Sequence, residues 1–380
     1  MARLAIIGAS EHQLQLIRKA KEKGHETHVF AWAAGDVGER EADVFYPVSI
    51  TEQQEITRIC REVGVDGVCT IGTDLGNATA GAVAFNLGLP CNTPECVQAT
   101  TDKGIMRQRF AAAGSPSPKS ILVKEGEYPV LDGFQFPLIV KPIDRSGSRG
   151  ITKISCVDEL DDALDAAFEV GFEKRALVEE FAEGREFSIE GMSWNGNHAI
   201  LAITEKFTTG APHFIERGHL QPARISANEA ARIREVVSNA LDALGVRMGA
   251  SHAELKMADD GTIRIIEIAS RMGGDCIGSD LVQLSTGIDF VGAVVDAALG
   301  IQPNLLPNPR CVHAHAAVRF SFGPSDTSEL RDLMAAHPEW VVRDTLIDSE
   351  EHAVTDSSTR SGCVVFAFEE TLERVDLGLW

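Results

Sequence analysis

Residues 136–150 read FPLIVKPIDRSGSRG, and this stretch decides the fold of the middle of the chain. The apolar run over 136–142 predicts a strand that ends at Lys141, and a loop rich in serine and glycine follows over 146–150. Backbone N–H groups of such a loop can surround phosphate groups, while a lysine at the strand end neutralises their charge. The stretch therefore predicts a phosphate-binding loop, and a surface hairpin with two glycines is the alternative.

Two further strands, over 250–256 and 262–268, are joined by a hairpin turn at Asp259-Asp260-Gly261. Glu254 and Glu267 lie on these strands, and carboxylates on paired strands can sit side by side. Two adjacent carboxylates repel each other unless a cation or a shared proton lies between them. Oxygen ligands of this kind suit Mg²⁺ that carries nucleotide phosphates, whereas the alternative is a solvated face of the hairpin.

Arg271 follows the second carboxylate by four residues and leads into Met272-Gly273-Gly274, where a backbone can approach a ligand closely. A guanidinium there can stabilise a phosphoryl group or a tetrahedral oxyanion, and pairing with a nearby carboxylate is the alternative. Asp275 follows this turn and is a candidate for the lining of an acceptor pocket.

The N-terminal part, residues 1–98, alternates strands with helices, which is typical of a parallel, doubly wound sheet. Its first turn, Gly8-Ala9-Ser10, lacks the GxGxxG fingerprint, so a dinucleotide is not expected here. The strand over 66–71 ends at Gly72-Thr73-Asp74, where a helix begins. This part is therefore expected to be a Rossmann-like domain.

The last part, residues 301–380, begins after a proline-rich linker and carries strands near 312–320 and 362–368. Acidic residues outnumber basic ones in it, so we expect a solvated appendage rather than an anion site. Between the two ends, the periodicity predicts further elements: helices over 101–113, 157–170 and 227–244, and a strand over 175–181.

The composition is that of a globular protein of 380 residues, with 44% apolar and 24% charged side chains. The net charge of −21 argues against a nucleic-acid partner held over a wide face. The N-terminal apolar run is too short for a signal peptide and no run reaches ~18 apolar residues, so we expect a cytoplasmic protein without a membrane partner. The eight cysteines lack CxxC spacing, which disfavours a zinc or redox site.

Five segments in one order carry a resemblance to a known family: 101–103 (TDK), 139–142 (IVKP), 146–150 (SGSRG), 178–186 (VEEFAEGRE), and 254–271 with its two glutamates and arginine. On these motifs the chain resembles the ATP-grasp superfamily of carboxylate–amine ligases, and most closely its L-amino-acid ligase branch. The resemblance implies an α/β ATP-grasp fold with three parts: an N-terminal Rossmann-like (preATP-grasp) domain over 1–98, an ATP-grasp domain over 99–300 with a mobile phosphate-lid subdomain at about 118–186, and a small C-terminal α+β subdomain over 301–380.

The resemblance also implies roles for single residues. ATP would be bound through phosphate contacts from Lys103 and Lys141 and a loop cap of Ser146, Gly147, Ser148 and Arg149. Adenine contacts would come from Glu179 and from the backbone of Phe181 and Ala182, and ribose contacts from Glu186. Mg²⁺, with Mn²⁺ as an alternative, would be held by Glu254 and Glu267, and Arg271 would steady an acyl phosphate. Many relatives have Asn at the position of Ala269, so one metal position is short of a protein ligand.

The segment 209–219 resembles one that L-amino-acid ligases carry beside the substrate pocket, which implies substrate contacts from Glu216 and His219. A carboxylate suits an α-ammonium group, and an imidazole can hydrogen-bond a substrate or accept a proton near neutral pH. A structural turn with solvent-facing charges is the alternative. The segment 356–362 also resembles this branch, which implies that the last 80 residues belong to the enzyme.

The implied activity is an ADP-forming acid–amino-acid ligase that makes an amide bond through an acyl phosphate, with small-molecule carboxylate and amine substrates. Lid closure over ATP and a homodimer are further expectations that the family suggests. Two alternatives stay open: a carboxylase or carbamoyl-phosphate-type enzyme that activates bicarbonate, and an ATP-binding module without turnover.

Overall fold

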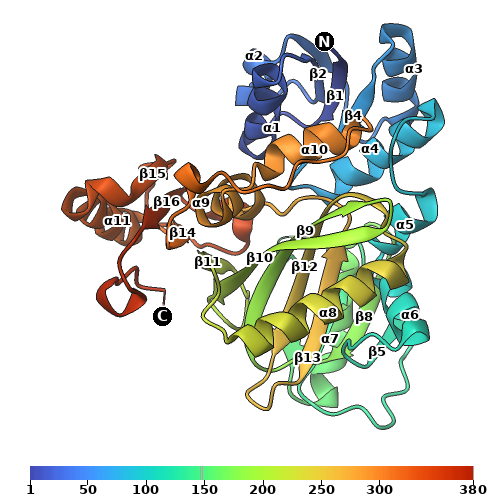
Figure 1. Cartoon of the computed structure of the whole chain (residues 1–380). Helices are drawn as coiled ribbons and strands as arrows, with labels where there is room; N and C mark the ends of the chain where they lie inside the picture. The colour runs from blue at the N-terminus through green and yellow to red at the C-terminus, as the bar shows by residue number, and fades with distance from the viewer. Residues whose placement is uncertain (146, 148, 380) are drawn as a thin grey trace.

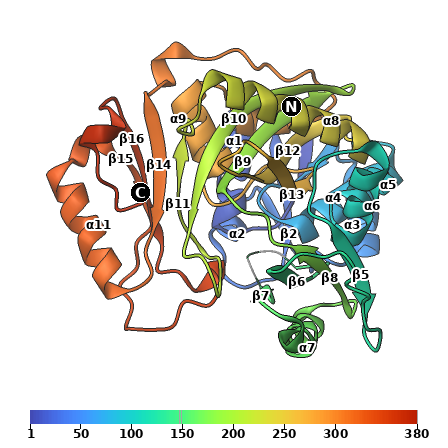
Figure 2. The ribbon, with the colours of Figure 1, turned by 90° about the horizontal axis from the view of Figure 1, so that it is seen from below.

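The computed structural model describes residues 1–145, 147 and 149–379. Within these residues the strands form three sheets: a parallel N-terminal sheet, a small antiparallel sheet, and an eight-stranded antiparallel sheet at the centre (Figure 1). The mixed architecture confirms the α/β class expected from the sequence. The arrangement places the small sheet across from the central sheet, as the view from below shows (Figure 2).

The N-terminal sheet has the order β3-β2-β1-β4, and all its pairings are parallel. Every residue of β1 from the second onward is buried, which explains why the sequence of this strand is a continuous apolar run. The elements of this domain are β1 (Arg3–Ile7), α1 (Glu11–Glu22), β2 (Glu26–Ala31), α2 (Val37–Glu41), β3 (Val44–Pro47), α3 (Gln53–Val63), β4 (Gly67–Cys69) and α4 (Asp74–Leu87). The structure thus confirms the Rossmann-like reading of this domain.

Two helices, α5 (Pro94–Ala99) and α6 (Lys103–Ala113), lead into the small sheet, whose order is β5-β8-β6-β7. Its core packs Leu138 and Val140 against α7, and this unit occupies the residues that were expected to form the lid. Its elements are β5 (Ser120–Lys124), β6 (Leu138–Pro142), β7 (Thr152–Ile154), a 3-10 turn (Val157–Glu159), α7 (Leu160–Val170) and β8 (Arg175–Glu180).

The central sheet has the order β13-β12-β9-β10-β11-β14-β16-β15, so strands from the C-terminal part extend it directly. Its strands are β9 (Arg185–Trp194), β10 (Asn197–Thr208), β11 (Glu216–Gln221), β12 (Met248–Met257), β13 (Ile263–Ala269), β14 (His315–Phe320), β15 (Val341–Asp344) and β16 (Cys363–Phe368). The predicted hairpin at Asp259-Asp260-Gly261 joins β12 to β13, where Gly261 N–H donates to the carbonyl of Ala258.

Helices cover both faces of the central sheet (Figure 1). One face packs against α6 and α8 (Ala227–Leu244). The other meets α10 (Phe290–Ala298), which also packs against α1 of the N-terminal domain. The remaining helical elements are a π-helical turn (Ile277–Leu281), α9 (Val282–Thr286), α11 (Pro324–Ala336) and 3-10 turns at Pro309–Cys311, Pro338–Trp340, Ser357–Thr359 and Leu372–Arg374.

In the part of the chain that the structure describes, a search for membrane-crossing helices finds no single helix of sufficient length and apolarity. One pair, Ile277–Thr286 with Phe290–Ala298, satisfies the criteria of length and composition together but is bent by 120° between its halves.

The expectation that the last part is a solvated appendage is wrong. β14 pairs with β11 over four residues, and β16 is buried along its whole length. Two apolar clusters fix this part to the rest of the chain, one of which joins Leu281 to Val318 and Val365. The net charge did not reveal that this part is packed into the protein, because the acidic residues lie mostly on α11 and in loops, while the strands are apolar.

Candidate active site

A cleft lies between the small sheet and the central sheet and encloses about 1090 Å³ of free space up to its open mouth. A second hollow of about 750 Å³ adjoins it toward the C-terminal part. The two share seven lining residues: Asp74, Gly147, Lys206, Glu216, His252, Glu254 and Arg271.

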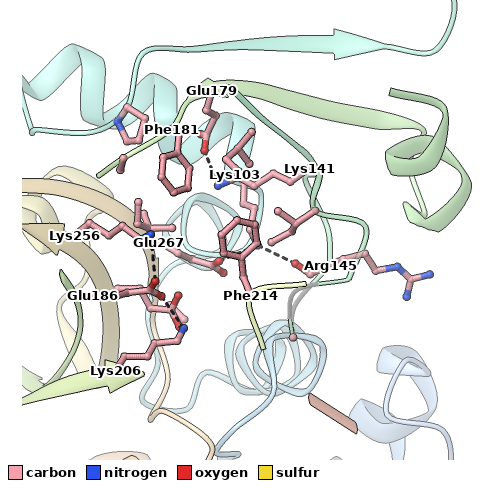
Figure 3. Close-up of a pocket in the computed structure, with 18 of the residues that line it drawn as sticks. Lys103, Lys141, Arg145, Glu179, Phe181, Glu186, Lys206, Phe214, Lys256 and Glu267 are labelled. Carbon is pink, nitrogen blue, oxygen red and sulfur yellow. Dashed lines mark hydrogen bonds and ion pairs between the residues drawn. The ribbon is translucent and has the colours of Figure 1, made fainter. Parts of the chain in front are cut away.

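Two aromatic rings, of Phe181 and Phe214, point into the first hollow and form a tilted contact with their centroids 6.2 Å apart (Figure 3). Lys153 Nζ lies 3.7 Å and Lys256 Nζ 4.7 Å from the centroid of the Phe181 ring. The rings give the hollow an apolar wall that has cations close to it.

Lys103 and Lys141, the residues expected at the phosphates, both line this hollow, and both are buried. Lys103 Nζ lies 3.0 Å from Glu267 Oε2 and donates to the carbonyl of Arg145, whose own side chain points away from the cavity (Figure 3). Lys141 Nζ lies 2.6 Å from Glu179 Oε2. Burial lowers the pKa of Lys141, since the attraction of Glu179 does not fully offset it. These two ammonium groups are placed to meet anionic ligand oxygens.

Glu179 lines the first hollow, but its carboxylate is already held by two cations. Arg107 Nε lies 2.6 Å from its Oε1 atom, opposite Lys141 on Oε2. Burial alone would raise the pKa of Glu179, but Arg107 and Lys141 lower it to about 2. An adenine contact from this carboxylate would have to coexist with both ion pairs.

The backbone expectation for Phe181 needs a correction. Its amide N–H donates to the carbonyl of Pro137 at 3.0 Å, because the chain leaves β8 beside β6. The amide N–H of Phe181 therefore cannot also read a base edge. The expectation narrows to the carbonyl oxygen of Phe181 and the backbone of Ala182, which lines the hollow.

The predicted loop is described in part. Gly147 lines both hollows, and its backbone is in the left-handed region with φ 68°. Ser146 and Ser148 lie outside the described residues. Arg149 is exposed and does not line either hollow, and its charge helps to lower the pKa of Asp356. The placement of Arg149 thus gives no support to a direct phosphate contact.

Glu254 and Glu267 form a directly opposed pair in the β12–β13 ladder, as the hairpin predicted. Both line the first hollow. Burial alone would raise the pKa of Glu254, but Lys206 and His252 hold it well below its usual range, so this group is charged. A charged carboxylate directly opposite a second one fits Mg²⁺, which prefers a few protein oxygens together with substrate phosphates.

Among the described residues, no group of three or more His, Cys, Asp or Glu side chains forms a metal site by itself. Ala269, at the position where Asn would add a ligand, lies in the first hollow without a donor side chain. The donor set therefore fits a cation shared between Glu254, Glu267 and ligand oxygens rather than one enclosed by protein.

Lys206 lies at the junction of the hollows and was not predicted. Its Nζ atom lies 3.0 Å from Glu186 Oε1, 3.3 Å from Glu216 Oε1 and 3.2 Å from Glu254 Oε1 (Figure 3). It links the residue expected at the ribose, the residue expected at the substrate and a metal candidate. These three carboxylates raise its pKa well above the usual value despite burial, so Lys206 is a fixed cation.

His252 continues this charged network on β12. Its Nδ1 atom is 2.5 Å from Oε1 of the fully buried Glu190, and its Nε2 atom is 3.3 Å from Glu254 Oε1. Burial alone would lower the pKa of His252, but the two carboxylates raise it to about 9. A side chain at Gly273 would collide with the Glu190 carboxylate, which explains why glycine is required there.

Arg271 lines both hollows as predicted, and its partner comes from the N-terminal domain. Its Nε and Nη2 atoms lie 2.8 and 2.7 Å from Asp74 Oδ1. Asp74 is the first residue of α4, directly after the predicted end of strand β4. Arg271 can therefore pair with Asp74 and still present its guanidinium to a ligand in the hollows.

The second hollow contains Glu216 and His219, both on β11, and Asp275 from the turn after β13. His219 is 1% exposed, and neither ring nitrogen has a hydrogen-bond partner within the described part of the chain. Its Nε2 atom lies 3.9 Å from Asp275 Oδ2, beyond hydrogen-bond distance. A buried imidazole without a hydrogen-bond partner costs free energy unless a ligand forms hydrogen bonds with it.

Several residues of the cleft were not predicted, because only the arrangement of the strands in the sheet shows that they lie at the site. Asp74, Gly72 and His12 lie at the carboxyl ends of β4 and β1, where the strand order reverses in the N-terminal sheet. Parallel sheets bind ligands at such points, so the carboxyl ends of the predicted strands could have indicated these residues. Arg107 and Lys206 had no comparable signal, since neither stands in a motif.

Comparison with known proteins agrees with this geometry. Residues 134–280 match the family model described as the ATP-grasp domain. The uncharacterized protein y4rH of Sinorhizobium fredii is 31% identical over 292 residues, which cover 75% of this chain and 59% of that protein. Alanine–anticapsin ligase of Bacillus subtilis is 25% identical over 302 residues, covering 71% and 62%. The chain thus spans about 60% of the length of these curated relatives.

Among solved structures, L-amino acid ligase from Bacillus licheniformis superposes with a TM-score of 0.80 at 23% identity. The alignment covers 98% of this chain and 95% of that one. These findings confirm the resemblance on which the site residues were transferred. The chain therefore has the ATP-grasp fold and carries an ATP-grasp domain over residues 134–280.

Proposed function

We propose that this protein is an ATP-dependent ligase that joins a carboxylate to an amine through an acyl phosphate and releases ADP and phosphate. An amino acid is the proposed substrate, as the name of the B. subtilis relative suggests for a related chain. The observation that carries the proposal is the shared wall of the two hollows: Glu254, Lys206 and Arg271 face both. Groups that bind phosphate therefore stand next to groups that suit an amino acid.

In the proposed complex, the base of ATP lies in the first hollow against the wall that Phe181 and Phe214 form, and Glu186 accepts hydrogen bonds from the ribose hydroxyls. Lys103 and Lys141 contact the phosphates as buried cations that line the same hollow. Their role is to neutralise charge and to orient the γ-phosphate, since phosphoryl transfer depends mainly on position and electrostatics.

Glu254 and Glu267 would hold Mg²⁺, which supplies Lewis-acid stabilisation of phosphate charge when it is bound. Mn²⁺ would suit the same oxygen donors. Arg271 is oriented by Asp74 with its Nη1 atom directed to the carbonyl of Met272. In this position the guanidinium can stabilise the oxyanion that develops on the carbonyl oxygen when the amine attacks the acyl phosphate.

The amine then attacks the activated carbonyl from the second hollow, and phosphate leaves. The amine must be neutral to attack, so a proton has to be removed from its ammonium form. His219 is the group placed to accept it, because its ring nitrogens have no partner among the described residues. Glu216 accepts a hydrogen bond from the same substrate group.

The test is phosphate release from Mg-ATP with single L-amino acids and with pairs of them, together with mass analysis of the products. The proposal expects ADP, phosphate and a product whose mass equals the sum of two substrates less water. A bicarbonate control separates the alternative activation of bicarbonate, which would release ADP without any amino acid. ATP binding with no release across the panel would contradict an amino-acid substrate.

A further inference from the structure

Arg360 belongs to the C-terminal part, yet it reaches the wall of the second hollow. It lies between the turn Ser357–Thr359 and strand β16, with 8% of its side chain exposed. Its guanidinium carbon lies 3.6 Å from the centroid of the Phe320 ring, so one face is covered. The orientation of the guanidinium is thus fixed by packing as well as by hydrogen bonds.

The hydrogen bonds of Arg360 are directed at Asp275 and at backbone. Its Nη2 atom lies 2.7 Å from Asp275 Oδ1 and its Nη1 atom 3.0 Å from Oδ2, a bidentate pair. Nε donates to the carbonyl of Ser357 at 2.8 Å, and Nη1 to that of Glu216 at 3.4 Å. Arg360 does not line the hollow itself, whereas Asp275 does.

Asp275 needs such an anchor because of its backbone. Asp275 has φ 50° and Cys276 has φ 66°, both in the left-handed region that non-glycine residues rarely adopt. Two consecutive residues in this region turn the Asp275 carboxylate toward β11. Burial alone would raise the pKa of Asp275, but the charge of Arg360 keeps it below its usual range.

The same C-terminal segment also anchors the second carboxylate of the hollow. Ser357 Oγ donates to Glu216 Oε2 at 2.8 Å, while Lys206 holds the other oxygen at 3.3 Å. Asp275, Glu216 and the imidazole of His219 therefore converge on one space as three hydrogen-bond acceptors. An ammonium group has three donors and no acceptor, which matches this set.

We infer that Arg360 is a positioning residue, which fixes the Asp275 carboxylate so that Asp275, Glu216 and His219 together bind the ammonium group of the amine substrate. This inference rests on the proposed function and assigns the second hollow to a primary amine such as the α-amino group of an amino acid. It also makes the C-terminal part a component of the substrate site.

The chain offers a matched control in Arg343. This residue also comes from the C-terminal part and also forms a bidentate pair, with Asp280 at 3.0 and 2.9 Å. Asp280 lies only five positions beyond Asp275 but is not among the lining residues of the second hollow. Arg343 Nη2 also lies 3.1 Å from Cys276 Sγ, so Arg343→Lys disturbs a contact to the same turn without breaking an ion pair that faces the hollow. Arg360→Lys breaks the pair whose carboxylate, Asp275, lines the hollow.

Lysine keeps the charge but loses the planar fork, so Arg360→Lys should fold while releasing Asp275. With the pair of L-amino acids that the wild type ligates fastest, we expect its KM for the amine to rise about 10-fold or more, given the cost of small misplacements. The KM for ATP should stay within about twofold, and less amide should form per ADP, because an acyl phosphate without an oriented amine reacts with water. Arg343→Lys should match the wild type in the KM for the amine, the KM for ATP and the amount of amide formed per ADP.

Crystal structures of both variants without substrate give a second readout that needs no activity. The Asp275 carboxylate should be displaced in Arg360→Lys and unchanged in Arg343→Lys. An unchanged Asp275, an unchanged amine KM, or an equal rise in the KM for ATP would overturn the inference. If the wild type shows no amino-acid-dependent ADP release, the proposed function fails, and the position of Asp275 still decides whether Arg360 fixes it.

Discussion

Lys206 Nζ lies 3.2 Å from Glu254 Oε1, and together with His252 it lets this carboxylate remain charged inside the cleft. The same ammonium group also contacts Glu186 and Glu216. Removal of the Lys206 charge would leave these carboxylates with an excess of negative charge, which a divalent cation at Glu254 would reduce. Lys206 and a bound metal ion are therefore both expected to reduce the repulsion between these carboxylates.

Replacement of Lys206 by methionine should destabilise the fold and make its stability depend on Mg²⁺. Removing one partner of a buried ion pair costs about 3–5 kcal/mol, because the remaining charges lose their compensation. Mg²⁺ should recover part of this loss, so the melting temperature of Lys206→Met should rise more with MgCl₂ than that of the wild type. Lys21→Met removes a partly exposed pair with Asp43 and is the control. An equal effect of MgCl₂ on all three proteins would contradict this expectation.

Glu267→Gln should abolish turnover and leave the fold intact. Glutamine keeps the shape of the side chain in the β12–β13 ladder but removes the charge that faces Lys103 and the proposed metal. We expect phosphate release to fall at least ~100-fold, the scale on which loss of one electrostatic contact to the reacting groups is felt. Circular dichroism should be unchanged. The exposed Glu183, changed to glutamine, should keep full activity, and equal activity of both variants would exclude Glu267 as a metal ligand.

The carboxylate pair could be predicted in part, because a short turn joins its two strands. The hairpin at Asp259-Asp260-Gly261 brings positions 254 and 267 close together on paired strands, but a β-bulge between Glu254 and Leu255 is needed to set them directly opposite each other. The strand before Lys141 and the loop after it were indicated by equally local patterns. Short-range patterns thus indicated the residues that we propose to bind phosphate and metal.

The substrate half depends on contacts between distant segments, which periodicity does not encode. Arg360 and Asp275 are 85 positions apart, and Arg271 and Asp74 are 197 apart. Lys206 faces its carboxylates only because β10 pairs with β9 through an irregular register between Ile200 and Ala202. The net charge of the last part even pointed away from a role in the site, since a single buried arginine does not affect such a count.

The pair of Glu179 with Arg107 and Lys141 predicts a defined dependence of stability on pH. The pKa of Glu179 falls from 4.5 to about 2 on folding, so its stabilising contribution is complete above pH 4.5. It should decline as the pH falls from 4.5 toward 2, where the folded protein also takes up the proton. Glu179→Gln should cost about 3–5 kcal/mol of unfolding free energy at pH 7, and this cost should shrink below pH 4.5.

Urea denaturation of the wild type and Glu179→Gln at several pH values between 3 and 7 measures this difference directly. Glu62→Gln removes an exposed pair with Arg58 and should behave like the wild type at every pH. A difference between wild type and Glu179→Gln that stays constant down to pH 3 would show that the ionised carboxylate does not stabilise the fold.

Asp74 should affect the reaction although it belongs to the N-terminal domain. Both Arg271 contacts go to one oxygen, Asp74 Oδ1, so Asp74→Asn removes the charge that orients the guanidinium while leaving its size unchanged. We expect kcat to fall about 10-fold or more, because a guanidinium that is no longer held stabilises the developing oxyanion less well. The KM for ATP should change little, since Lys103 and Lys141 remain in place.

Asp66→Asn is the control. Asp66 lies at the opposite end of the same sheet, where its carboxylate accepts a hydrogen bond from the backbone N–H of Arg3. Steady-state ADP formation separates the outcomes: a lower kcat for Asp74→Asn alone means that the N-terminal domain orients a group at the reacting centre, whereas a change in the KM for ATP alone would assign Asp74 to nucleotide binding.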